Sequence, residues 1–372
     1  MHTVTLYAVP HSVYSGRARS YLIKAGIPYR EIGPHTEHFL NDVVPKAGGR
    51  NSMPTVELES GEVVRDGAAI IDYFEEKNGH TFSPKTPKQR FVSRLFDVIG
   101  AEGLNRPYMH FRWNFDDENF EFQKYHFDMI VGRGEGRSEF RDLLIGAMRK
   151  ATVSLGVTPE TAPVVEAVYL DLLAALDCHF EQYGYLLGGH PCIGDFGLMI
   201  PLFGHLGRDP KALALMQKQA KAVFRFTERM NRFASDLVEF ENQDETYLPD
   251  DDIPETLINV MRAVAEDFVP ETLAAADTIN AWIAQQNALE PGTHCKRSVG
   301  TAQFELRGQT VSAIAQPYRF FLLKRAQDEY AAMGDADREA MDTILEASNM
   351  KPVLDARLSR EVGMQGNMEV WL

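Results

Sequence analysis

One short stretch near the N-terminus constrains the fold more than any other part of this chain. The apolar segment Thr3–Val9 predicts a β-strand, and a loop containing Pro10 follows it directly. Apolar residues spaced at i, i+3, i+4 and i+7 predict a helix from about Ser15 to Ala25. Ser12 is therefore expected beside the free N–H groups of a helix N-terminus. Such a position stabilises an anion, whether phosphate, carboxylate or thiolate.

The next sixty residues continue this alternation of strands and helices. A second short strand is predicted at Tyr29–Ile32, and the segments Thr55–Leu58 and Glu62–Val64 flank a hairpin turn. Asp66 then caps a helix that runs to about Lys77. The order is β-α-β, an irregular link, and β-β-α. It predicts a four-stranded mixed sheet covered by helices.

Two proline-containing stretches divide the remainder of the chain. Residues 83–87 and 247–254 have the composition of linkers, and the periodicity between and after them is mainly helical. We therefore expect an α/β domain at 1–82, an all-helical domain at 88–245 and a further, mainly helical segment at 250–372.

The last segment contains three local patterns. Pro254 and Pro270 each precede Glu-Thr-Leu, which predicts two helix starts with proline in the first turn. Phe304–Leu306 and Gln309–Val311 predict a small hairpin. A helix is expected from about Ala313 to Met333.

Bulk composition excludes several classes of function. The chain has 372 residues, 44% of them hydrophobic, and a formal charge of −15 with no block of basic residues. Nucleic acid and anionic membrane surfaces are therefore not expected as partners, and no apolar run approaches the ~20 residues of a membrane span. The first residues, Met1 to Thr3, lack the features of a signal peptide.

The three cysteines form no CxxC pair, which favours a reducing compartment, the cytoplasm. Histidine spacing predicts no metal site.

Four motifs in order resemble the glutathione transferase superfamily, over roughly residues 3–240. The first is Ser12-Val13-Tyr14-Ser15-Gly16-Arg17-Ala18-Arg19, which is similar to the start of the first helix in its serine- and cysteine-type classes. The others are Met53-Pro54, Asp66-Gly67-Ala68-Ala69-Ile70 and Pro191-Cys192-Ile193-Gly194-Asp195-Phe196. The resemblance implies a thioredoxin-like N-terminal domain followed by an all-α domain. The segment 250–372 resembles nothing that we recognise.

This resemblance implies glutathione as co-substrate and Ser12 as the residue whose hydroxyl stabilises the thiolate. A free thiol has a pKa near ~8.5, so a hydroxyl donor and a helix N-terminus both favour its ionised form. Tyr14 and Tyr7 are the alternatives, because other members of the family carry their hydroxyl on a tyrosine of the first strand. Thiol–disulfide exchange is not expected, since Ser12 stands where a cysteine would be required.

The resemblance also implies the residues that bind glutathione. The bond between Met53 and Pro54 is expected to be cis, so that the backbone of Met53 pairs with the peptide ligand. Asp66 and Gly67 are expected to face the γ-glutamyl end, although the usual hydroxyl residue is missing at Gly67. Arg50 is a candidate for the glycyl carboxylate. Asp66 as a plain helix cap and Arg50 as a solvated loop residue are the structural alternatives.

A second group of residues is expected near the electrophilic substrate. Tyr108, Phe111, Arg112 and Trp113 fall near the end of the helix that borders the substrate pocket in this family, and would suit a bulky aromatic molecule. Packing in the core is the alternative. Asp195 is expected to serve folding through a reciprocal cap with Cys192 rather than catalysis.

Together these patterns predict a cytosolic, serine-type glutathione transferase-like enzyme with a C-terminal extension. The predicted reaction is thiolate attack on an electrophilic, hydrophobic or aromatic small molecule. A homodimer is expected from the resemblance, although the extension could cover or replace the interface. The alternative from another class is a non-catalytic binding or assembly protein that has kept the fold.

Overall fold

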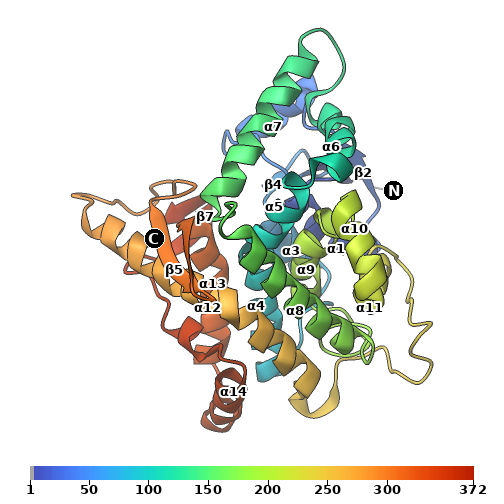
Figure 1. Ribbon diagram of the computed structural model, residues 1–372, viewed down its shortest axis with the longest axis vertical. Coiled ribbons are helices and arrows are strands. Elements are labelled where there is room, and N and C mark those ends of the chain that lie inside the picture. The colour runs from blue at the N-terminus through green and yellow to red at the C-terminus, as the bar shows by residue number, and fades with distance from the viewer. Residues whose placement is uncertain (1–3) are drawn as a thin grey trace.

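The structure is a computed structural model that describes residues 4–372, and Thr3, the first residue of the predicted strand, lies outside that range (Figure 1). The N-terminal domain is built on one sheet with the strand order β2-β1-β3-β4. Its strands are β1 (Val4–Tyr7), β2 (Tyr29–Ile32), β3 (Thr55–Glu57) and β4 (Val63–Arg65). β1 is parallel to β2 and antiparallel to β3, so the predicted mixed sheet is confirmed.

Helices cover both faces of this sheet. The helices α1 (Val13–Lys24) and α3 (Gly67–Lys77) pack against each other on one face. The other face is covered by η1 (Phe39–Val43) and α2 (Val44–Lys46), where Tyr7 packs against Phe39. The predicted end of the first strand and both predicted ends of α1 differ from the structure by one to two residues, because local patterns define helix and strand ends poorly.

A helical region follows, and α9 lies at its centre. Its elements are α4 (Pro87–Val98), η2 (Ile99–Gly103), α5 (Asn105–Trp113), α6 (Asp116–Val131), α7 (Arg137–Ser154), α8 (Ala162–Phe180), α9 (Ile193–Gly204), α10 (Pro210–Gln219) and α11 (Lys221–Met230). α9 packs on both α1 and α4. Glycine is needed at the crossing with α1, because a Cβ at Gly16 would lie 2.8 Å from the carbonyl oxygen of Met199. As predicted, Asp195 begins α9 by accepting a 2.7 Å bond from the backbone N–H of Cys192.

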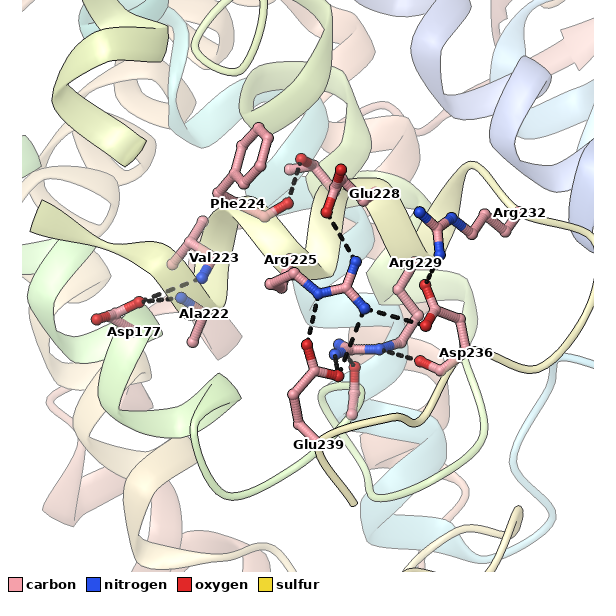
Figure 2. Close-up of polar contacts among 12 residues, drawn as sticks. Asp177, Ala222, Val223, Phe224, Arg225, Glu228, Arg229, Arg232, Asp236 and Glu239 are labelled. Carbon is pink, nitrogen blue, oxygen red and sulfur yellow. Dashed lines mark hydrogen bonds and ion pairs between the residues drawn. The ribbon is translucent and has the colours of Figure 1, made fainter. Parts of the chain in front are cut away.

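Charged side chains organise the end of this region (Figure 2). Asp177 of α8 accepts bonds from the backbone N–H groups of Ala222 and Val223, the first turn of α11. Arg225 then binds Glu228 and Asp236, and the neighbouring Arg229 donates to the backbone carbonyl of Asp236. These contacts hold the irregular segment 231–248 against α11 although it contains no helix or strand.

The C-terminal extension packs along the helical region, where Figure 1 shows it in orange and red. Its elements are η3 (Pro249–Asp251), α12 (Glu255–Ala284), β5 (Thr301–Leu306), β6 (Gln309–Ile314), α13 (Pro317–Ala331), α14 (Asp335–Ala347), η4 (Lys351–Leu354), β7 (Val362–Gln365) and β8 (Met368–Trp371). α12 lies against α8 and β5, and α13 lies against α4. The β7–β8 hairpin reaches the edge strand β4 of the N-terminal sheet, where the side chain of Asn367 accepts a bond from the backbone N–H of Arg65.

Two predictions for the extension are wrong. Pro270 does not start a helix but lies inside the single 30-residue helix α12. Arg106 of α5 explains this, because its guanidinium binds Asp267 and Glu271 on either side of the proline and aligns the two halves. Ala313 does not begin a helix either. It pairs with Ala302 in the predicted β5–β6 hairpin, which is confirmed, and α13 begins at Pro317.

Two further properties bear on function. None of the helices in residues 4–372 is long and apolar enough to cross a membrane. Within the same residues, no three histidine, cysteine, aspartate or glutamate side chains gather as a metal-binding group.

Candidate functional site

A cavity of about 330 Å³ lies between the N-terminal domain and the C-terminal extension. This volume is at the lower end of the range for small-molecule sites. The cavity is lined by residues from both parts of the chain, namely Tyr14, Arg50, Asn51, Ser52, Met53, Pro54, Arg65, Asp66, Glu102, Cys295, Lys296, Arg297, Gln316, Tyr318 and Glu369. Of the residues that the sequence suggested for glutathione, Arg50, Met53, Pro54 and Asp66 therefore meet here, together with Tyr14.

The bond between Met53 and Pro54 is cis, as the sequence predicts. It stands immediately before β3, and the carbonyl oxygen of Pro54 accepts a 3.1 Å bond from the backbone N–H of Asp66. This bond holds the start of α3 beside the cis peptide. The backbone of Met53 is left at the cavity wall, where an extended peptide could pair with it.

Asp66 caps α3, and its second carboxylate oxygen is also occupied. Oδ1 accepts bonds from the backbone N–H groups of Ala68 and Ala69 at 2.9 and 3.2 Å. Oδ2 accepts a 2.8 Å bond from the hydroxyl of Tyr318 on α13. Asp66 has a φ of 87°, which is unfavourable for a residue with a Cβ. The cap and the tyrosine hold this backbone in place. Gly67, the next residue, is buried in the first turn of α3 and does not line the cavity.

A carboxylate from the extension pairs with two arginines of the N-terminal domain. Glu369 of β8 lies 2.7 Å from Arg50 and 3.0 Å from Arg65, measured from carboxylate oxygen to guanidinium nitrogen. Burial alone would raise the pKa of Glu369, but Arg65 and Arg50 outweigh it and the pKa is lowered. Arg50 and Arg65 therefore already have an anion beside them.

Ser12 lies at the N-cap of α1, as predicted, and is half-buried. Its oxygen accepts a 2.8 Å bond from the hydroxyl of Ser15, which leaves the Ser12 O–H itself to donate to another group. Ser12 does not line the cavity, whereas Tyr14 does.

The two tyrosine alternatives occupy different sides of the sheet. The hydroxyl of Tyr7 donates a 2.8 Å bond to Glu57 and lies away from the cavity. Tyr14 borders the cavity, and burial raises the pKa of its hydroxyl, so it remains a proton donor at neutral pH. Of the two, Tyr14 lines the cavity and Tyr7 does not.

The residues predicted around the electrophile are packed in the interior. Tyr108, Phe111, Arg112 and Trp113 are all buried, and none of them lines the cavity. Arg112 forms a two-bond contact with Asp209 at 2.6 and 2.8 Å. The helix that carries them, α5, packs against α6, α7, α8 and α10, and Trp113 also borders a separate hollow of about 300 Å³.

A second hollow, of about 1070 Å³, opens on the other side of the β1–α1 loop. It lies between this loop and the hairpin formed by α6 and α7, and it is lined in part by Pro10, His35, Tyr125 and Arg137. Pro10 is two residues from Ser12, so the start of α1 stands between the two hollows.

Sequence reasoning missed the residues that the extension contributes, among them Tyr318 and Glu369. Both are ordinary residues in helical and strand patterns, and their role depends on a contact with the N-terminal domain far away in sequence. Nothing in their local sequence could have identified them.

Comparison with known proteins agrees with this geometry. Residues 6–82 match the family model described as the N-terminal domain of glutathione S-transferase, so the match assigns this domain, and not the rest of the chain, to that family. No curated protein matches the chain.

Three solved structures are similar to parts of the chain. A GST-like protein from Pseudomonas syringae is 16% identical, with 85% of this chain and 97% of that chain covered and a TM-score of 0.42. The β-etherase LigF from Sphingobium sp. strain SYK-6 is 17% identical, with 64% and 98% covered and a TM-score of 0.42. A glutathione S-transferase from Methylobacterium radiotolerans, in complex with glutathione sulfonate, is 15% identical, with 63% and 92% covered and a TM-score of 0.38.

Proposed function

We propose that this protein binds glutathione in the 330 Å³ cavity and activates its thiol for attack on an electrophilic, hydrophobic or aromatic small molecule. The observation that carries this proposal is that Met53, Pro54 and Asp66 line one cavity together with Tyr14 of α1. An extended backbone segment next to a helix N-terminus suits a small peptide that carries an ionisable thiol.

In this proposal the thiolate is stabilised by a hydroxyl and by the first turn of α1. Ser12 supplies the hydroxyl in this proposal, because its O–H is free to donate and it stands at the N-cap, although it lies outside the lining of the cavity. Tyr14 is the alternative donor, since it borders the cavity. The electrophile enters from the second hollow, which approaches Ser12 from the Pro10 side.

The carboxylates of glutathione meet an unusual set of partners. Arg50 and Arg65 are paired with Glu369, so a ligand carboxylate that binds either guanidinium would have to share it with Glu369. Lys296 and Arg297 also line the cavity and are exposed, which makes them the cations open to a ligand carboxylate. Asp66 remains the group suited to the ligand's ammonium.

The pairing of Glu369 with Arg50 and Arg65 favours a second candidate function, a non-catalytic binding or assembly protein with this fold. Glu369 occupies the position next to Arg50 and Arg65 where a ligand carboxylate would otherwise pair. If this carboxylate excludes glutathione, the fold serves a partner or a different ligand.

The assignment of roles to the three segments is also part of the proposal. Residues 1–82 bind glutathione, 88–245 form the helical scaffold, and 250–372 complete the cavity wall. We further propose a cytoplasmic homodimer that needs no metal. Light scattering on the purified protein measures the oligomeric state, and a monomer would overturn the dimer.

Calorimetric titration with glutathione, combined with the thiolate absorbance as a function of pH, tests the proposed function. We expect wild type to bind and to lower the thiol pKa. Ser12→Ala should bind without lowering it, while the exposed control Ser154→Ala behaves as wild type. If Tyr14→Phe loses the effect instead, Tyr14 is the donor. Absence of binding would overturn the glutathione function and favour the second candidate.

A further inference from the structure

Glu102 places a buried carboxyl group at the wall of the cavity. It belongs to η2, the short π-helical turn after α4, and only 2% of its surface is exposed. Its oxygen Oε2 is buried and has no hydrogen-bond partner in residues 4–372. A buried carboxyl oxygen without a partner is costly and is rare in folded proteins, so it points to a group that the protein itself does not supply.

The nearest guanidinium is already engaged elsewhere. Arg319 of α13 donates to the backbone carbonyl of Glu102 at 2.8 Å, but its ion pair, at 2.6 Å, is with Glu271. Burial therefore dominates and raises the pKa of Glu102 to about 7, with Arg319 lowering it and Glu271 raising it. The other polar groups that face this carboxyl come from several elements and are Asn105, Arg297, Tyr14, Tyr108 and Tyr318.

Four other titratable groups of the cavity are unsuited to take up a proton at neutral pH. Burial raises the pKa of the hydroxyls of Tyr14 and Tyr318, so both already carry their protons. Burial also raises the pKa of the Cys295 thiol, to about 12. Glu369 is held ionised by two arginines. Glu102 differs from all four because it can exist in either form near pH 7.

We propose that Glu102 accepts the thiol proton of glutathione bound in this cavity and keeps it inside the protein, an inference that rests on the proposed function. Met53 and Glu102 line the same cavity, so a peptide paired with the Met53 backbone brings its thiol close to this carboxylate. The S–H bond breaks and an O–H bond forms on the carboxylate. The thiolate then attacks the electrophilic carbon, the leaving group departs with its electron pair, and Glu102 returns the proton to it or to solvent.

The number of protons that leave the protein when glutathione binds tests this step. Without an internal acceptor, ionisation of the thiol releases about one proton to the buffer. With Glu102 as acceptor, the negative charge of the neighbouring thiolate raises the pKa of this carboxyl further, so wild type at pH 8 should keep the proton and release close to none. Calorimetry in buffers of different ionisation enthalpy measures this number on the full chain, and S-methylglutathione, which has no thiol, serves as the ligand control.

Glu102→Gln should bind glutathione and release about one proton, while the exposed control Asp335→Asn behaves as wild type. Equal proton release by wild type and Glu102→Gln would overturn the role of Glu102 and leave the proposed function standing. Absence of glutathione binding by wild type would overturn both.

A second measurement needs no variant. The infrared difference spectrum of wild type at pH 8, with and without glutathione, should gain the band of a protonated carboxyl group. If that band is missing although glutathione binds, the proton is not on Glu102 and the proposal is wrong.

Discussion

The hydroxyl of Tyr318 lies 2.8 Å from Oδ2 of Asp66, across 252 positions of sequence. This bond joins the C-terminal extension to the first turn of α3. The cavity that contains both residues is therefore a product of the whole chain and not of the N-terminal domain alone.

Removing this hydroxyl should destabilise the protein. Tyr318→Phe keeps the ring but leaves Oδ2 of Asp66 without its donor, and we expect a loss of about 2 kcal/mol in the free energy of unfolding. Urea denaturation measures the loss. Tyr125→Phe is the matched control, because Tyr125 is 63% exposed, and it should change the stability little. A loss no larger than that of the control would show that the bond does not hold the extension.

Replacing Glu369 should cost more, because it leaves the buried charge of Arg65 without its partner. We expect Glu369→Gln to lower the free energy of unfolding by about 3 kcal/mol at neutral pH. The pKa of Glu369 is lowered in the folded protein, so the stability it contributes is present above the unfolded value of about 4.3 and is lost as the pH falls. Denaturation of both proteins between pH 7 and pH 3 should show the difference shrinking toward acid. A difference that is constant with pH would contradict this account of the ion pair.

Two glutamates of α12 provide an internal comparison of buried and exposed ion pairs. Glu271 is buried between Arg106 and Arg319, which outweigh the effect of burial and lower its pKa to about 2. Glu271→Gln should therefore cost about 4 kcal/mol at pH 7, and this contribution should disappear between about pH 4 and pH 2. Glu266→Gln breaks the exposed pair with Arg307 and should cost less than about 1 kcal/mol. Equal losses for the two variants, measured by denaturation, would overturn this interpretation.

Much of the N-terminal domain could be predicted because its signals are local. The start of α3 is determined by Asp66 and the turn residues beside it, all of which are adjacent in sequence. The cis peptide at Pro54 follows from a short motif. The helix through Pro270 could not be predicted in the same way. Arg106, a residue of α5, supports its continuity by binding Asp267, one turn before the proline, and Glu271, directly after it.

The candidate site likewise contains some residues that the sequence suggested and others that it did not. The sequence suggested Arg50, Met53, Pro54, Asp66 and Tyr14, and these lie together because one domain positions them all. It did not suggest Glu102, whose importance comes from burial and from an oxygen without a partner. Arg112 was predicted as a pocket residue because the resemblance places its helix beside the substrate pocket, but Asp209, almost a hundred residues away, pairs with it in the core.

The contact between Asp66 and Tyr318 also sets an order of events during biosynthesis. Ribosomes add about 5–20 residues per second, so Asp66 is made on the order of tens of seconds before Tyr318. Throughout that interval the nascent N-terminal domain has no second wall for its cavity. A small molecule therefore cannot be enclosed in this cavity until the extension has been synthesised and has packed against the N-terminal domain.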